Sequence, residues 1–110
     1  MAFGSQWQAL AITWAVELPV LFAWLSAWPA RRVLAAGLGA SLATHPVAWW
    51  ASSLLSPHDH TRGVWAIELC VWLAEALLLL LVLRVRAGRA LAAAGTANLA
   101  SFALGAWLWA

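Results

Sequence analysis

Four apolar runs, each long enough to cross a lipid bilayer as a helix, take up almost all of the 110 residues of the chain. They span residues 7–30, 33–55, 63–83 and 90–110, and each holds 21 to 24 residues. At 1.5 Å of rise per residue, about 20 residues cross a hydrocarbon core about 30 Å thick. Because no water bonds the backbone there, each run must satisfy its own amide groups as a helix. The sequence therefore predicts a single-domain, all-α polytopic membrane protein with four transmembrane helices.

Composition excludes the soluble classes of protein. Hydrophobic residues make up 65% of the chain and charged residues 9%, whereas soluble domains hold about 45–50% and about 25%. So few charges cannot cover the surface of a globule this small. The formal net charge of +2 comes from arginines placed between the apolar runs, so it does not indicate a nucleic-acid-binding surface. The expected partner is the lipid bilayer, and nucleic acid is not expected.

The placement of the arginines predicts the orientation. The chain has no lysine, and five of its six basic residues lie in the first and third connections. They are Arg31, Arg32, Arg84, Arg86 and Arg89. With four spans these connections share one side, which the positive-inside rule assigns to the cytoplasm, and tryptophans such as Trp49 and Trp65 then form an outer aromatic belt. We expect an up-down four-helix bundle, N-out/C-out, in a bacterial inner membrane.

Three of the four acidic residues lie inside the predicted spans. Glu17 falls in the first run, and Glu68 and Glu75 fall in the third. An ionisable side chain at mid-membrane costs about 2.5–3.5 kcal/mol on insertion scales, so such residues commonly mark a functional site. The alternative is that each carboxyl is protonated and hydrogen-bonds a neighbouring helix as a packing contact.

Further polar residues accompany these acids. By helical rise, Glu17 and Glu75 lie near the depth of His45 in the second run and of Asn98 in the fourth, between the outer interface and the midplane. Gathering these groups costs less than leaving each one facing lipid. We therefore expect one outward-facing intramembrane site. Its candidate residues are Glu17, Thr44, His45, Glu68, Glu75, Asn98 and Ser101.

The loop between the second and third runs offers a second, weaker candidate. His58, Asp59 and His60 place two imidazoles and a carboxylate in three residues, but strong metal sites need three or four ligands fixed in geometry. The alternative is a polar turn that begins at Pro57. A haem held by two histidines of one chain is not expected, because His45 is the only histidine inside a span. The cofactor that stays a candidate is a divalent metal ion.

Short polar motifs in all four runs carry a resemblance. The first run holds Glu17-Leu18-Pro19, the second Thr44-His45-Pro46, the third the paired Glu68 and Glu75, and the fourth Asn98-Leu99-Ala100-Ser101. Over its whole length the chain resembles uncharacterised small bacterial four-helix integral membrane proteins. This resemblance implies that the polar residues belong together, and it supplies no activity.

A second resemblance rests on Glu17 alone. In length, in four helices and in this glutamate of the first helix, the chain is similar to the small multidrug resistance exporters, in which that residue exchanges protons for cationic drugs. The two acids of the third run and the one-sided arginines depart from that family's pattern. The likeness therefore implies a role for Glu17 and carries no further residue over.

Three functions are compatible with this sequence. The first is a binding or transport protein whose outward-facing carboxylate and histidine site takes a divalent cation or protons. The second is an accessory subunit that binds a larger membrane complex, a pigment or lipid. A third, weaker one is a small intramembrane hydrolase in which a carboxylate and His45 act on water. We also expect a homo-oligomer or membership of a larger membrane complex, because four short helices bury few residues completely.

Overall fold

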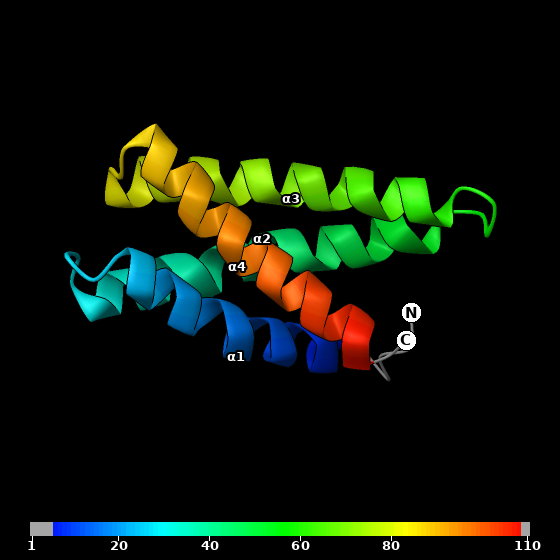
Figure 1. Cartoon of the computed structure of the whole chain (residues 1–110), viewed down its shortest axis with the longest axis horizontal. Helices are drawn as coiled ribbons and strands as arrows, with labels where there is room; N and C mark the ends of the chain where they lie inside the picture. The colour runs from blue at the N-terminus through cyan, green and yellow to red at the C-terminus, as the bar shows by residue number, and fades with distance from the viewer. Residues whose placement is uncertain (1–5, 109–110) are drawn as a thin grey trace.

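The computed structural model describes residues 6–108, which fold into four α-helices joined by short connections (Figure 1). The helices are α1 (Gln6–Trp24), α2 (Ala30–Ser53), α3 (His60–Leu83) and α4 (Ala87–Leu108). Successive helices run in opposite directions (Figure 1). The all-helical prediction is thus confirmed, and its last two residues, 109 and 110, lie outside the described part of the chain.

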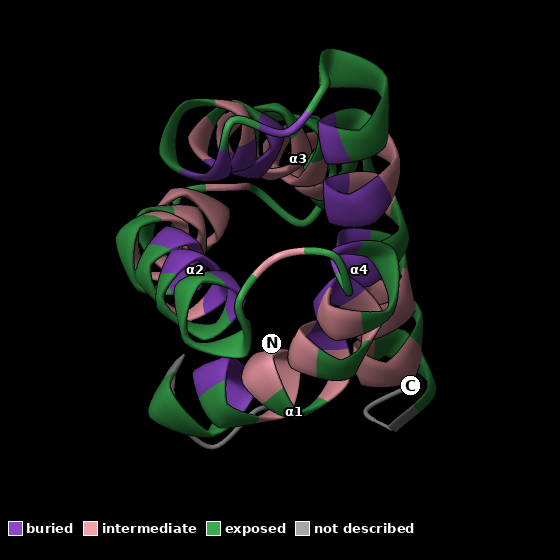
Figure 2. Ribbon diagram, turned by 90° about the vertical axis from the view of Figure 1, so that its left-hand side faces the viewer, coloured by how far each residue is buried: buried purple, intermediate pink, exposed green. Residues whose placement is uncertain are grey.

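The four helices form a ring. Each one packs against two neighbours, in the pairs α1 with α2, α2 with α3, α3 with α4, and α4 with α1. Viewed along the long axis, the buried residues face the middle of this ring (Figure 2). Both arginine-bearing connections lie at one end, which we name the arginine end, and the α2–α3 loop lies with the start of α1 and the end of α4 at the opposite end, the loop end (Figure 1).

The arginine end is closed by a packed apolar core. Leu25 and Val33 are completely buried, and Leu79 and Leu83 of α3 are nearly so. On α4 the facing residues are all small. They are Ala90, Ala93, Ala94 and Ala97. Because alanine side chains let helix backbones approach closely, α4 can pack tightly on its neighbours over this stretch.

Two side chains seal the helix ends there. The indole Nε1 of Trp28 donates to the carbonyl of Leu83 at 3.0 Å, and Arg89 Nη1 donates to the carbonyl of Trp24, also at 3.0 Å. Both acceptors belong to the last turn of a helix, where carbonyls lack a partner within the helix. The guanidinium of Arg89 also lies 5.9 Å from the centre of the Trp28 ring. At the arginine end, these hydrogen bonds therefore join the helix ends in addition to the packed core.

The helix boundaries differ from the predicted ones at the arginine end. The first helix ends at Trp24 rather than at residue 30, because the next four residues form turns before Pro29, which caps α2. A proline disfavours helical backbone in the residue before it, so the first apolar run cannot continue as one helix. The arginines Arg31, Arg32 and Arg89 consequently lie in the first turns of α2 and α4 rather than in loops.

Three of the four helices are long and apolar enough to cross a membrane. These stretches are Trp7–Trp24 in α1, His60–Leu83 in α3 and Ala87–Trp107 in α4. The predicted second span, α2, is as long as α3 but less apolar, because it carries two arginines in its first turn and several glycine, serine and other polar residues along its length. The polar residues of α2 include Ser41, Thr44 and His45.

Candidate functional site

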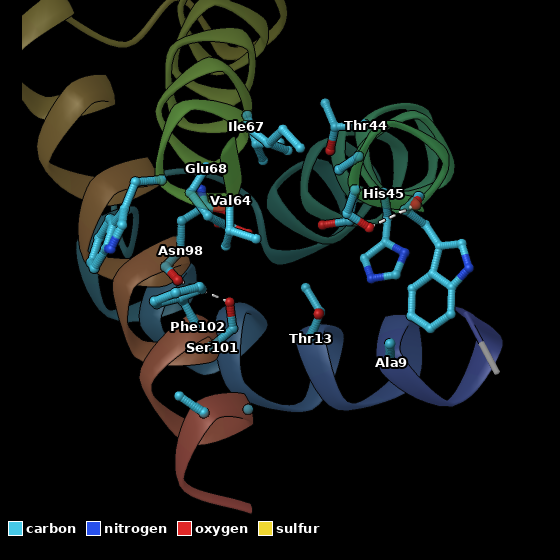
Figure 3. A pocket seen from close by; sticks show the side chains of 18 of the residues that line it. Ala9, Thr13, Thr44, His45, Val64, Ile67, Glu68, Asn98, Ser101 and Phe102 are labelled. Atoms are coloured by element: carbon cyan, nitrogen blue, oxygen red, sulfur yellow. Dashed lines mark hydrogen bonds between the residues drawn. The ribbon is translucent and has the colours of Figure 1, made fainter. Parts of the chain in front are cut away.

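A cavity of about 410 Å³ lies inside the loop-end half of the ring, and all four helices line it (Figure 3). The candidate residues from the sequence all belong to its lining. They are Glu17, Thr44, His45, Glu68, Glu75, Asn98 and Ser101. Figure 3 shows Thr13 of α1, His45 of α2, Glu68 of α3 and Ser101 of α4 around this space. The structure therefore brings together residues that lie up to 84 positions apart in the chain.

Two buried carboxyls form the floor of the cavity. Glu17 of α1 is 2% exposed and Glu75 of α3 is 5% exposed. They project from helices on opposite sides of the ring and are electrostatic neighbours, with Glu68 a weaker neighbour of Glu75. We call Glu17 and Glu75 the carboxyl pair. Below it, toward the arginine end, the apolar core begins at Leu21 and Leu79.

Hydroxyl and amide groups hold the carboxyl pair in place. Ser101 Oγ donates to Glu17 Oε2 at 2.6 Å, and Ser41 Oγ lies 3.5 Å from Glu17 Oε1. Asn98 Nδ2 donates to the Ala94 carbonyl of its own helix at 2.8 Å, and the same side chain is a polar neighbour of Glu75. Glu17 thus has a hydroxyl at each oxygen, one from α2 and one from α4. Among residues 6–108, no cationic side chain lies close enough to offset the charge of either carboxyl.

Glu68 and His45 lie nearer the loop end than the pair. Glu68 is seven residues before Glu75, hence on the same face of α3 and about two turns closer to the α2–α3 loop. His45 follows Ser41 by one turn of α2, and its Nδ1 is buried without a hydrogen-bond partner. Thr44 also lines the cavity, but its hydroxyl donates to the Ala40 carbonyl at 2.9 Å. The hydroxyl proton of Thr44 is therefore bonded within α2.

The described residues contain no ready-made cluster of metal ligands. Among residues 6–108, no three His, Cys, Asp or Glu side chains lie close enough together to share a metal ion. In the α2–α3 loop, Ser56 Oγ donates to Asp59 Oδ2 at 3.2 Å and accepts from the Asp59 N–H at 3.3 Å, which is the polar turn. His58 is exposed in that turn, and His60 begins α3 and lines the cavity.

Aromatic side chains form part of the cavity wall. Trp65 of α3 and Phe102 of α4 meet with ring centres 5.0 Å apart, and on α2 the rings of His45 and Trp49 stack at 6.2 Å. All four residues line the cavity. From sequence, Trp49 and Trp65 were expected in an interfacial belt, because their position near helix ends is typical of one.

Two residues of the cavity wall, Ser41 and Phe102, were not predicted from sequence. Ser41 lies four residues before His45, which puts both on one face of α2. That spacing was the available signal. Phe102 offered no such signal, because an apolar residue within an apolar span does not indicate whether its side chain faces lipid or a cavity.

Comparison of the chain with protein-family models, with curated proteins and with solved structures finds no match.

Proposed function

We propose that the chain is a small integral membrane protein that binds and exchanges protons at the carboxyl pair, and that the loop end faces the outside of a bacterial inner membrane. The five arginines at the opposite end support this orientation, because arginine-rich connections stay in the cytoplasm. With this orientation both termini and the α2–α3 loop face outward, and the cavity opens on that side.

The juxtaposition of Glu17 and Glu75 carries the proton assignment. Burying a carboxylate in low dielectric is costly, and two adjacent carboxylates without a cation cost still more. The neighbours of this pair are two serine hydroxyls, an amide and the more distant Glu68. Such a pair keeps at least one proton between its two members at neutral pH. Loss and recovery of that proton is then the chemistry that the site performs most easily.

A proton fits this donor set better than a divalent metal. Mg²⁺ and Ca²⁺ require about six or more oxygen ligands at a fixed distance, and zinc prefers nitrogen or sulfur. The carboxyl pair offers two acids, and His45 stands apart from them with its ring against Trp49. A shared proton needs only the two carboxyls and the hydrogen bonds that orient them.

Exchange runs through the cavity toward the loop end. Glu68 lies between the pair and the loop along α3, and His45 borders the same space on α2. Both side chains accept and release protons, and the cavity is large enough to hold water beside them. In the other direction the packed core around Leu25 and Val33 leaves no comparable space. The pair therefore exchanges with the outer solution in this conformation.

Infrared titration of the full chain in lipid vesicles tests the proposal. At neutral pH the wild type is expected to show the carbonyl stretch of a protonated carboxyl. Glu17→Gln and Glu75→Gln should each shift or weaken it, because each removes one of the two carboxyls that share a proton, and the double variant should remove the contribution of the pair. Asp59→Asn, an exposed loop acid, is the matched control and should keep the band. A wild type without the band, or a band that the double variant leaves unchanged, would contradict the proposal.

A further inference from the structure

The cavity is larger and more apolar than a proton site needs. Its volume of about 410 Å³ falls within the range of about 300–1,000 Å³ that is typical of small-molecule sites. Water alone could reach the carboxyl pair through a far narrower channel. The excess volume, enclosed between aromatic walls, indicates an organic ligand.

The floor of the cavity accepts hydrogen bonds and carries negative charge. Glu17 and Glu75 supply four carboxyl oxygens, and the hydroxyl proton of Ser101 is already directed at Glu17. Asn98 uses its amide nitrogen on the Ala94 carbonyl, which leaves its Oδ1 as an acceptor. A ligand group that suits this floor donates several hydrogen bonds and is positively charged.

Little space continues beyond the carboxyl pair toward the arginine end. A separate void there holds only about 10 Å³, and apart from Glu17 and Glu75 its lining is apolar, with Leu21 and Leu79 among it. A ligand group on the pair therefore lies on the loop-end side, within the cavity. A primary ammonium there has N–H groups to donate to the carboxyl oxygens, whereas a trimethylated nitrogen is wider and has none.

The walls above the floor suit an apolar body. Trp65 and Phe102 meet across α3 and α4, and His45 and Trp49 stack on α2. Aromatic rings bury apolar surface and attract a nearby cation through their faces. A flat or chain-like hydrocarbon group that lies between these walls would place its polar end at the carboxyl pair.

We propose that this cavity binds a small organic primary ammonium ion, with its hydrocarbon body between the aromatic walls and its ammonium group on Glu17 and Glu75. The inference rests on the proposed function, because the ammonium replaces the shared proton. The incoming ion brings one positive charge, and the pair releases its proton to water in the cavity. The charge within the site is therefore the same before and after exchange.

Calorimetry on the full chain in lipid nanodiscs tests this inference with three probes that share the same phenylethyl group. They are 2-phenylethylammonium, its N,N,N-trimethyl analogue and neutral 2-phenylethanol. We expect the primary ammonium to bind at least about tenfold more tightly than either analogue, since only it brings both a positive charge and N–H groups to the carboxyl pair. Repeating the titration in buffers of different ionisation enthalpy should reveal the release of about one proton for each ligand bound.

Site variants locate the binding. Glu75→Gln should weaken binding of the primary ammonium by about tenfold or more, because one of its two carboxyl partners is lost, while Asp59→Asn leaves binding unchanged. Equal binding of the trimethyl analogue, or unchanged binding in Glu75→Gln, would overturn the inference. The comparison among probes uses the wild type, so it stays decisive even where a variant fails to fold.

Failure of the inference and failure of the proposed function give different results. A protonated-carboxyl band that depends on Glu17 and Glu75, together with no binding of the primary ammonium, would overturn the ligand and keep the proton site. Selective binding of the ammonium without the band and without proton release would support the ligand and overturn the shared proton.

Discussion

The two halves of the bundle are built from the same four helices and yet differ in packing and in polarity. At the arginine end, four alanines of α4 face Leu25, Val33 and Leu79, and the ring closes on an apolar core. At the loop end, the same α4 presents Asn98, Ser101 and Phe102, and the ring encloses a cavity. Small apolar side chains let the helices meet, whereas polar and aromatic ones keep them apart. The difference between the halves thus comes from side-chain size and polarity.

Removing bulk from the closed half should have the largest effect on stability. Leu25 is completely buried between the helices, so Leu25→Ala is expected to lower the free energy of unfolding by about 2–4 kcal/mol through lost contacts and a residual cavity. The carboxyl pair lies in the other half, so the protonated-carboxyl band should persist in the folded variant. Detergent-induced unfolding measures the first quantity and infrared spectroscopy the second. A stability change below about 1 kcal/mol would contradict the tight packing assigned to this end.

Changing the polar half should affect the site more than the fold. Ser101→Ala removes the 2.6 Å hydrogen bond to Glu17, a bond to a charged or proton-sharing group worth about 1.5–3 kcal/mol. We expect binding of a primary ammonium to weaken by about tenfold, because Glu17 loses the group that positions it. Ser101→Thr keeps a hydroxyl and should restore most of the affinity. If alanine and threonine behave alike in calorimetry, the hydroxyl does not position Glu17.

The fold was more predictable than the site, for physical reasons. Long apolar runs dictate helices whatever their neighbours, so the positions of α1 to α4 followed from sequence. The end of α1 did not, since the turn before Pro29 interrupts a run that stays apolar to residue 30. The gathering of Glu17, Glu75 and Asn98 followed from the cost of facing lipid. Which end of the ring closes was not predicted, because it depends on the combined size and polarity of side chains from all four helices, and no single residue encodes that.

A hydrogen bond between α3 and α4 should respond to the addition of a single methyl group. The indole of Trp72 donates to the Leu91 carbonyl at 2.7 Å and so ties α3 to α4. A Cβ atom at Gly95 would lie 2.9 Å from that indole nitrogen, so Gly95→Ala should displace the ring and cost about 0.5–1.5 kcal/mol as the bond is lost. The helix preference of alanine offsets part of this. Gly88→Ala, which meets open space, is the matched control in detergent unfolding. Gly95→Ala should therefore be less stable than Gly88→Ala, and equal stability of the two variants would show that Trp72 does not restrain α4.

Substitutions in the loop should have the smallest effect. Asp59 is exposed, and its polar contacts stay within the turn at Ser56. Asp59→Asn should therefore change the free energy of unfolding by less than about 0.5 kcal/mol and leave ligand binding unaltered. A metal held by His58, Asp59 and His60 would give a different result, because zinc would then stabilise the wild type and not the variant. Thermal unfolding with and without zinc distinguishes the two outcomes.

The contrast between an open outer half and a closed inner half is tested most directly by chemical accessibility in oriented vesicles. With Cys70 changed to alanine, single cysteines at Thr13 in the cavity and at Ala36 in the closed core are treated with a membrane-impermeant thiol reagent from either side. We predict that Thr13→Cys reacts from outside only and that Ala36→Cys reacts from neither side. Reaction of Thr13→Cys from the cytoplasmic side alone, or of Ala36→Cys from either side, would contradict an outward-facing cavity above a closed core.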